Sequence, residues 1–120
     1  MNTARLILQV IIALGIFNVW LVRFNKATDY RGGPAKNMKE EFAVYGFPAW
    51  FMYTIGALKV TLAVLLLIGI WVPVLVRPAS AFMAMLMAGA VSMHIRVKDS
   101  IKKAMPATAM LLMSLFVAIS

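Results

Sequence analysis

The sequence contains no cysteine and only one histidine, and these two shortages exclude several kinds of chemistry. Without cysteine there are no disulfides, thiolate metal sites or thiol redox reactions. A lone histidine cannot supply the several ligands that a metal or haem site needs. The chain also has no Gly-x-x-x-x-Gly-Lys nucleotide loop and no set of nucleophile, base and orienting residue. We therefore predict no catalytic residues, no metal and no resident cofactor, which favours a non-enzymatic role.

Charged residues are also scarce, and apolar length takes their place. Charged residues make up 13% of the 120 positions and hydrophobic residues 63%, whereas soluble domains have about 25% and about 45–50%. The apolar residues form four runs that approach the roughly 20 positions a helix needs to cross a bilayer. We predict one all-α domain over residues 1–120, an integral membrane four-helix bundle whose helices cover about 4–23, 48–72, 78–96 and 101–120.

Carboxylates are the scarcest charged groups, with four Asp and Glu against twelve Lys and Arg, for a net charge of +8. All four carboxylates lie between the apolar runs, so the chain lacks the intramembrane carboxylate that a small multidrug exporter would use to couple protons to its substrate. The basic residues lie in the same connections rather than on one soluble face. This distribution favours the lipid bilayer as partner and argues against nucleic acid.

The positive charges are distributed unevenly between the two sides of the predicted bundle. The side with both termini and the second connection carries Arg5 and Arg77. The other side carries Arg23, Lys26, Arg31, Lys36, Lys39, Arg96, Lys98, Lys102 and Lys103. Because Lys-rich and Arg-rich connections normally stay in the cytoplasm, we predict that both termini lie outside it.

The first connection has the helical period of an amphipathic segment. Ala35, Met38, Phe42 and Tyr45 recur at spacings of three, four and three, which places them on one helical face. Pro34 suits the start of such a helix. We predict a short amphipathic helix over about 34–45 that lies in the membrane interface or folds back on the bundle. A solvated polar loop is the alternative.

Two motifs resemble those of a known family. The stretch 30–33 reads Tyr-Arg-Gly-Gly, and the stretch 56–60 reads Gly-Ala-Leu-Lys-Val, with Pro73 after it. Together with the order of the segments, they resemble the DoxX-like family of small four-helix membrane proteins over essentially the whole chain. The resemblance implies a bacterial inner-membrane protein. Some relatives are linked to quinone-coupled or thiol-linked oxidoreductase complexes, and others to membrane-protein assembly. A helix-two carboxylate is frequent in DoxX relatives; here Lys59 occupies that region, so no catalytic residue is carried over.

Lys59 lies inside the second predicted membrane helix, where an ionisable residue indicates a functional site by default. It follows Tyr53 by six residues, about 9 Å along the helix, so its side chain can reach toward the basic side of the membrane. The alternative is that Lys59 pairs with a carboxylate of the first connection and lines a polar pocket near the cytoplasmic side. The hypothetical ligand-binding set is then Lys59, His94, Tyr30, Arg31, Glu40 and Glu41. His94 has its own alternative, a helix-end residue that bonds backbone or lipid head groups.

Small residues recur on the third predicted helix with a spacing of four. They let helices approach closely in lipid, so we expect this stripe to pack inside the bundle; a homodimer seam is the alternative. The stripe consists of Ser80, Ala84, Ala88 and Ser92, with Gly89 beside them.

Two functions of different classes fit the sequence. The first is a non-enzymatic membrane subunit that acts as an assembly or scaffold partner, for example of a membrane or membrane-associated oxidoreductase. The second is a redox subunit that binds a quinone or a lipid at the polar pocket, with quinone as its one candidate cofactor.

Overall fold

The computed structural model describes residues 3–28 and 30–120, and no strand occurs in this part of the chain. Four long helices and one short helix make up the fold. They are α1 (Thr3–Phe17), which continues as a π-helical turn η1 (Asn18–Val22), then α2 (Met38–Val44), α3 (Ala49–Ile68), a 3-10 turn η2 (Pro73–Leu75), α4 (Val76–Arg96) and α5 (Ile101–Ile119).

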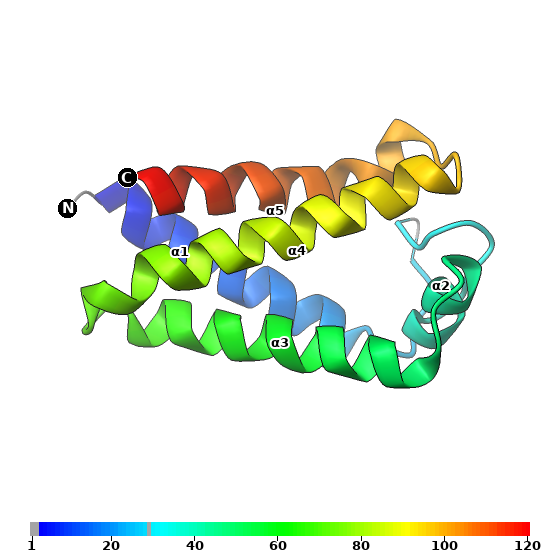
Figure 1. Cartoon of the computed structure of the whole chain (residues 1–120), viewed down its shortest axis with the longest axis horizontal. Helices are drawn as coiled ribbons and strands as arrows, with labels where there is room; N and C mark the ends of the chain where they lie inside the picture. Colours follow the sequence, from blue (N-terminus) through cyan, green and yellow to red (C-terminus); the bar gives the residue numbers. More distant parts are fainter. Residues whose placement is uncertain (1–2, 29) are drawn as a thin grey trace.

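The four long helices run along the length of the molecule, and both termini lie at the end opposite α2 (Figure 1). The segments Thr3–Val22, Ala49–Ile68, Pro73–Arg96 and Ile101–Ile119 are each long and apolar enough to cross a membrane. The molecule is 42 Å long, which exceeds the roughly 30 Å of a bilayer's hydrocarbon core. The prediction of an all-α membrane four-helix bundle is confirmed.

Many apolar side chains of these helices are left uncovered by the protein. In the most apolar 18-residue stretch, only 28% of the residues of the first span, 33% of the second and third and 11% of the fourth are buried. A helix in water would need a polar outer face, whereas the outer faces here carry Leu14, Val64, Met85 and Leu112. Lipid is therefore the medium that these faces require.

The helices meet in pairs that change along the bundle. Near the termini α1 lies beside α5; it then crosses toward α3, while α4 packs along α5 (Figure 1). Buried Ile12, Met52, Leu66 and Met83 fill the space between them. Within this core Gln9 donates a hydrogen bond from Nε2 to the carbonyl oxygen of Leu66 at 2.8 Å, which ties α1 to the end of α3.

The short helix α2 begins at Met38, later than the 34–45 range that its apolar period predicts. Asn37 sets this start, because its side chain accepts a hydrogen bond from the Glu40 amide at 2.8 Å, while the Glu40 carboxylate accepts one from the Lys36 amide at 3.0 Å. The bond from Glu40 to Asn37 satisfies one of the amides that the first helical turn leaves without a backbone partner. The apolar face is buried as a unit, since Ala35, Met38, Phe42 and Tyr45 all lie inside.

The small-residue stripe of α4 lies inside the bundle for only half its length. Ser80 and Ala84 are buried, whereas Ala88, Gly89 and Ser92 are exposed. A helix with 3.6 residues per turn advances about 40° beyond a full turn every four residues. Three such steps carry the stripe from the bundle interior to the outer surface.

Candidate functional site

A cavity of about 810 Å³ lies in the half of the bundle nearest α2. The tight connection holds α3 and α4 together at one end, and the two helices diverge toward the other end (Figure 1). All four long helices and the first connection contribute to the lining. The volume falls within the range of about 300–1,000 Å³ that is typical of small-molecule sites.

The walls of the cavity are mainly apolar, and polar groups enter it at a few defined places. Met87, Met93 and Met110 line the α4 and α5 sides, and Phe51 and Ile55 line the α3 side. The charged and polar lining residues include Asn18, Arg23, Thr28, Tyr30, Arg31, Glu41, Tyr45, Lys59, His94 and Lys103. An apolar body with a few convergent polar groups is the usual form of a ligand site.

Lys59 is the charged lining residue that lies within the membrane-spanning helix α3. It is only 8% exposed, and its Nζ lies 5.6 Å from the ring centroid of Trp20. Gly56, one turn earlier on α3, makes this arrangement possible, since a Cβ there would lie 2.5 Å from the Trp20 ring. The described residues contain no ion pair between Lys59 and a carboxylate. The Trp20 ring is therefore the close electrostatic contact that the structure shows for this ammonium group.

A chain of polar side chains crosses the α2 end of the cavity. Arg31 lies 3.6 Å from the carboxylate of Glu41, which lies 3.3 Å from the hydroxyl of Tyr45. The same hydroxyl is 3.4 Å from Nε2 of His94, whose Nδ1 lies 2.7 Å from the carboxylate of Asp99. The chain links the first connection to the connection between α4 and α5, which are far apart in sequence.

Within this series of polar side chains, the hydroxyl of Tyr45 keeps its proton and remains a hydrogen-bond donor. Burial raises the pKa of its hydroxyl, and the negative charges of Glu41 and Asp99 raise it further. This hydroxyl donates to the carboxylate of Glu41.

Arg31 also fixes the start of the first connection. Its guanidinium donates to the carbonyl oxygens of Arg23, Phe24 and Lys26, the last at 3.1 Å from Nη2. The Met38 amide donates to the carbonyl of Phe24 at 2.9 Å. The two ends of the loop are therefore held side by side just before α2 begins.

The paired glycines of this loop are close-approach positions. A Cβ on Gly32 would lie 2.5 Å from the hydroxyl of Tyr45. Gly33 has a φ of 52°, a left-handed conformation that glycine adopts readily. Its amide donates to Asp99 at 3.0 Å, and Lys103 donates from Nζ to its carbonyl. We call these contacts of Gly33, Asp99 and Lys103, together with the Asp99–His94 pair, the loop clasp.

The model of the DoxX-like family matches residues 7–117 of the 120. The chain belongs to the DoxX-like family. No curated protein and no solved structure matches it significantly. With four candidate spans, this DoxX-like chain is a small multi-pass membrane protein.

The structure places the sequence-predicted site residues of this DoxX-like protein in three situations. Arg31, Glu41, Lys59 and His94 line the cavity and are largely buried. Tyr30 also lines it but is 45% exposed at the mouth. Glu40 lies on the exposed side of α2, where it caps the helix. Glu41 has Arg31 as its ion-pair partner.

Sequence reasoning missed four residues of this site. Trp20 and Asp99 have no motif around them, and Lys103 is one of many loop lysines. The helical period places Tyr45 on the apolar face of the first connection and predicts no role for its hydroxyl. A signal for Tyr45 existed, since it follows Glu41 by four residues on one helical face.

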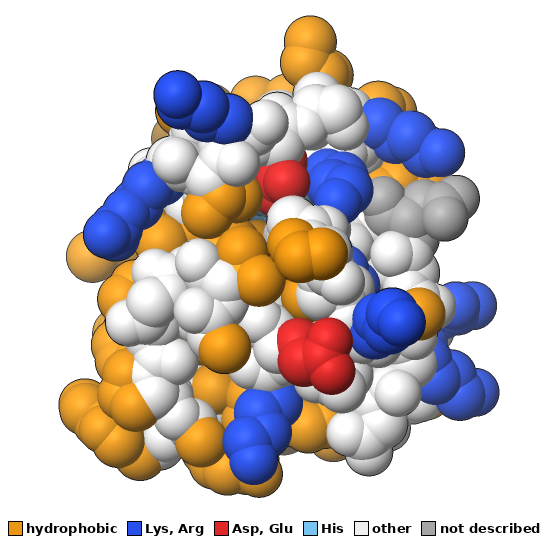
Figure 2. Space-filling model, turned by 90° about the vertical axis from the view of Figure 1, so that its right-hand side faces the viewer, with side chains coloured by type: hydrophobic (Ala, Val, Ile, Leu, Met, Phe, Trp, Pro, Cys, Tyr) orange, Lys and Arg blue, Asp and Glu red, His pale blue; other side chains and the backbone are white. Residues whose placement is uncertain are grey.

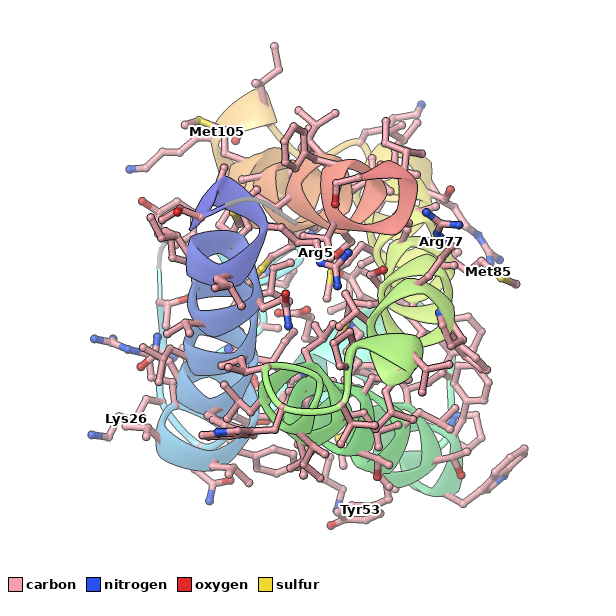
Figure 3. All side chains as sticks on the ribbon, turned by 90° about the vertical axis from the view of Figure 1, so that its left-hand side faces the viewer. Arg5, Lys26, Tyr53, Arg77, Met85 and Met105 are labelled. Carbon is pink, nitrogen blue, oxygen red and sulfur yellow. The ribbon has the colours of Figure 1, made fainter. Side chains whose placement is uncertain are left out.

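The basic residues of the sequence surround this end of the molecule. Figure 2 shows the face around α2, where Lys and Arg side chains lie around the rim and two acidic patches lie nearer the middle. Lys26 lies at the periphery of the bundle, whereas Arg5 points between helices at the opposite end (Figure 3).

Proposed function

We propose that this DoxX-like protein is a non-enzymatic membrane subunit that holds an amphipathic molecule, a quinone or a lipid, in its cavity. The observation that carries the proposal is the cavity of about 810 Å³, apolar along its walls and polar toward α2. An amphipathic ligand has the matching division between tail and head. Such a protein would supply bound quinone or lipid to an oxidoreductase rather than transform it.

The two regions of the cavity suggest how a ligand would lie. The tail would contact Met87, Met93 and Met110, whose flexible side chains adapt to irregular apolar shapes. The head would lie among Lys59, Tyr45 and His94, which offer hydrogen bonds to a carbonyl, hydroxyl or acidic group.

We further propose the bacterial inner membrane as the location, with the α2 end in the cytoplasm and both termini outside. The accumulation of Lys and Arg at the α2 end supports this orientation. The head of the ligand would then lie toward the cytoplasmic side.

The test uses Trp20 as a built-in reporter. Trp20 lines the cavity, whereas Trp50 and Trp71 are 68% and 79% exposed. A Trp50→Phe/Trp71→Phe protein in phosphatidylcholine nanodiscs would be titrated with a short-chain ubiquinone, which quenches tryptophan fluorescence. Saturable quenching that weakens in Lys59→Met and His94→Ala supports the proposal.

Exposed Lys39 gives the matched control, because Lys39→Met removes the same charge outside the cavity. Quenching that rises without saturation, equally in all variants, would reflect quinone dissolved in the lipid and would refute the cavity as its site.

A second function, that of a scaffold or assembly partner, rests on the outer surface. Ala88 and Ser92 are exposed on α4 outside the cavity, and small residues let another helix approach closely. A membrane or membrane-associated oxidoreductase or a second copy of the chain could pack there. Because the chain has no cysteine, Ser92→Cys would crosslink cleanly; disulfide dimers that Val64→Cys, on α3, forms equally well would argue against a seam at this place.

A further inference from the structure

We propose that the ligand of this cavity carries a single negative charge on its head, as a long-chain carboxylic acid does, and that Lys59 binds this head. The inference rests on the proposed function, since it names the class of amphipathic molecule. It does so from the position, the contacts and the charge of the residues around Lys59.

Lys59 lies at the middle of its membrane helix. It follows Ala49, the first residue of α3, by ten positions, about 15 Å along the axis. A cation at this depth is costly and usually finds an anion, a carbonyl or a water-filled cavity. Lys59 lines the cavity and is more than nine-tenths buried, so its ammonium group is directed into a space that a ligand can fill.

The protein compensates this charge only in part. Trp20 offers its ring at 5.6 Å, a contact that leaves the hydrogen-bonding capacity of the ammonium unused. Glu41 is the carboxylate that lines the same cavity, and it is engaged by Arg31 and Tyr45. An acceptor on the ligand would complete the coordination of Lys59 without disturbing that pair.

The charge of the lining favours an anion over a neutral or cationic head. Among the described lining residues, one carboxylate, Glu41, stands against the cationic groups of Arg23, Arg31, Lys59 and Lys103. Guanidinium groups are the preferred partners of phosphate because they bind it with two parallel hydrogen bonds. Arg31 is committed to Glu41 and to backbone carbonyls, and Arg23 donates to Asn18 on the exposed side of η1. The buried point charge of Lys59 therefore suits a carboxylate better.

The surroundings of Lys59 suit an alkyl chain. Ile16, Ile55, Leu86 and Met110 line the cavity on the four long helices. A long-chain acid that enters from the bilayer would place its tail among groups as apolar as the lipid it leaves. Its carboxylate would gain the contact with Lys59.

The experiment compares an acid with the matching alcohol. Dibromostearic acid and dibromostearyl alcohol, whose bromines quench tryptophan, would be titrated into the Trp50→Phe/Trp71→Phe protein in phosphatidylcholine nanodiscs. We expect saturable quenching of Trp20 by the acid, at least tenfold tighter than by the alcohol. Lys59→Met should weaken acid binding at least tenfold and alcohol binding by a much smaller factor, while Lys59→Arg and the Lys39→Met control should retain acid binding.

The outcomes separate the inference from the function beneath it. Equal affinity for acid and alcohol in the unsubstituted background, or acid binding that Lys59→Met does not alter, overturns the anionic head while the cavity remains a ligand site. No saturable quenching by the acid, the alcohol or a short-chain ubiquinone overturns both. If Lys59→Met fails to fold, the comparison of acid with alcohol in the unsubstituted background still decides.

Discussion

Removal of the Asp99 carboxylate should open the first connection while the bundle stays folded. Asp99 accepts a hydrogen bond from the Gly33 amide at 3.0 Å and lies 2.7 Å from Nδ1 of His94. It therefore holds the loop against the connection between α4 and α5. Asp99→Ala deletes both contacts and leaves Lys103 as the remaining member of the loop clasp on Gly33.

The size of the effect follows from the one hydrogen bond of Asp99 that joins the two connections. The Asp99–His94 pair lies within the α4–α5 side and is kept when the loop opens. A bond to a charged group contributes about 1.5–3 kcal/mol, and we take the lower limit because Gly33 is partly exposed and water can replace the carboxylate there. About 1.4 kcal/mol corresponds to a tenfold change in an equilibrium. Local opening of the loop should therefore become about tenfold more frequent.

Hydrogen exchange at the Met38 amide measures this opening, because that amide donates to the Phe24 carbonyl across the base of the loop. We expect its exchange to accelerate about tenfold in Asp99→Ala, with amides in the middle of α3 unchanged. Asp99→Asn keeps an acceptor for Gly33 and loses only the charged contact with His94, so a change of less than about threefold is expected. A Met38 amide that exchanges within threefold of the wild-type rate in Asp99→Ala would refute the clasp.

Three further predictions concern single side chains. The pKa of Tyr45 is raised above its ordinary value of about 10, so the folded state retains a proton that the unfolded state releases. The free energy of unfolding should therefore fall as pH rises above about 10, more steeply in wild type than in Tyr45→Phe. Denaturant titrations at pH 8 and 11 that show the same fall in both proteins would contradict this. Gly56→Ala should cost about 1–3 kcal/mol through overpacking against Trp20 and shift the Trp20 emission; an unchanged spectrum and unfolding midpoint would show that the contact is loose. Gln9→Leu loses one hydrogen bond to Leu66 and also removes a buried oxygen without a protein partner, so it should change stability by less than about 1 kcal/mol. Gln9→Ala should lose about 2–4 kcal/mol because it leaves a cavity. Equal losses of stability in the thermal unfolding of the two variants would refute the packing role of Gln9.

The sequence predicts the fold well because each helix has a recognisable pattern within its own residues. Apolar length identifies the membrane segments, and the spacing of Met38 and Phe42 identifies the buried face of α2. The direction in which each side chain of a helix points is harder to predict. Glu40 and Glu41 are neighbours in sequence, yet successive residues point about 100° apart on a helix. One therefore caps α2 in solvent, and the other lies in the cavity beside Arg31.

The contacts that complete the site are long-range and leave no local signal. Asp99 meets Gly33 across 66 positions, and Lys59 meets Trp20 through the crossing of α1 over α3. Both pairings depend on how helices cross, which neither composition nor period encodes. The lysine in the membrane was recognisable from sequence alone, whereas the ring beside it was not.

The Tyr-Arg-Gly-Gly motif contributes to the α2 end of the cavity and forms a cover there, in the sense that its loop lies against Tyr45 and Asp99. Arg31 donates hydrogen bonds to the backbone at the start of the loop. Gly32 and Gly33 allow the loop backbone to lie against Tyr45 and Asp99. The helix α2 packs mainly on α3 and is not part of the long-helix pairs. Opening the loop therefore breaks the clasp but leaves the bundle packed, so it costs less than global unfolding. A ligand held at Lys59 would add its own contacts only when the cover is closed, and such a ligand should slow exchange at Met38 rather than at the middle of α3.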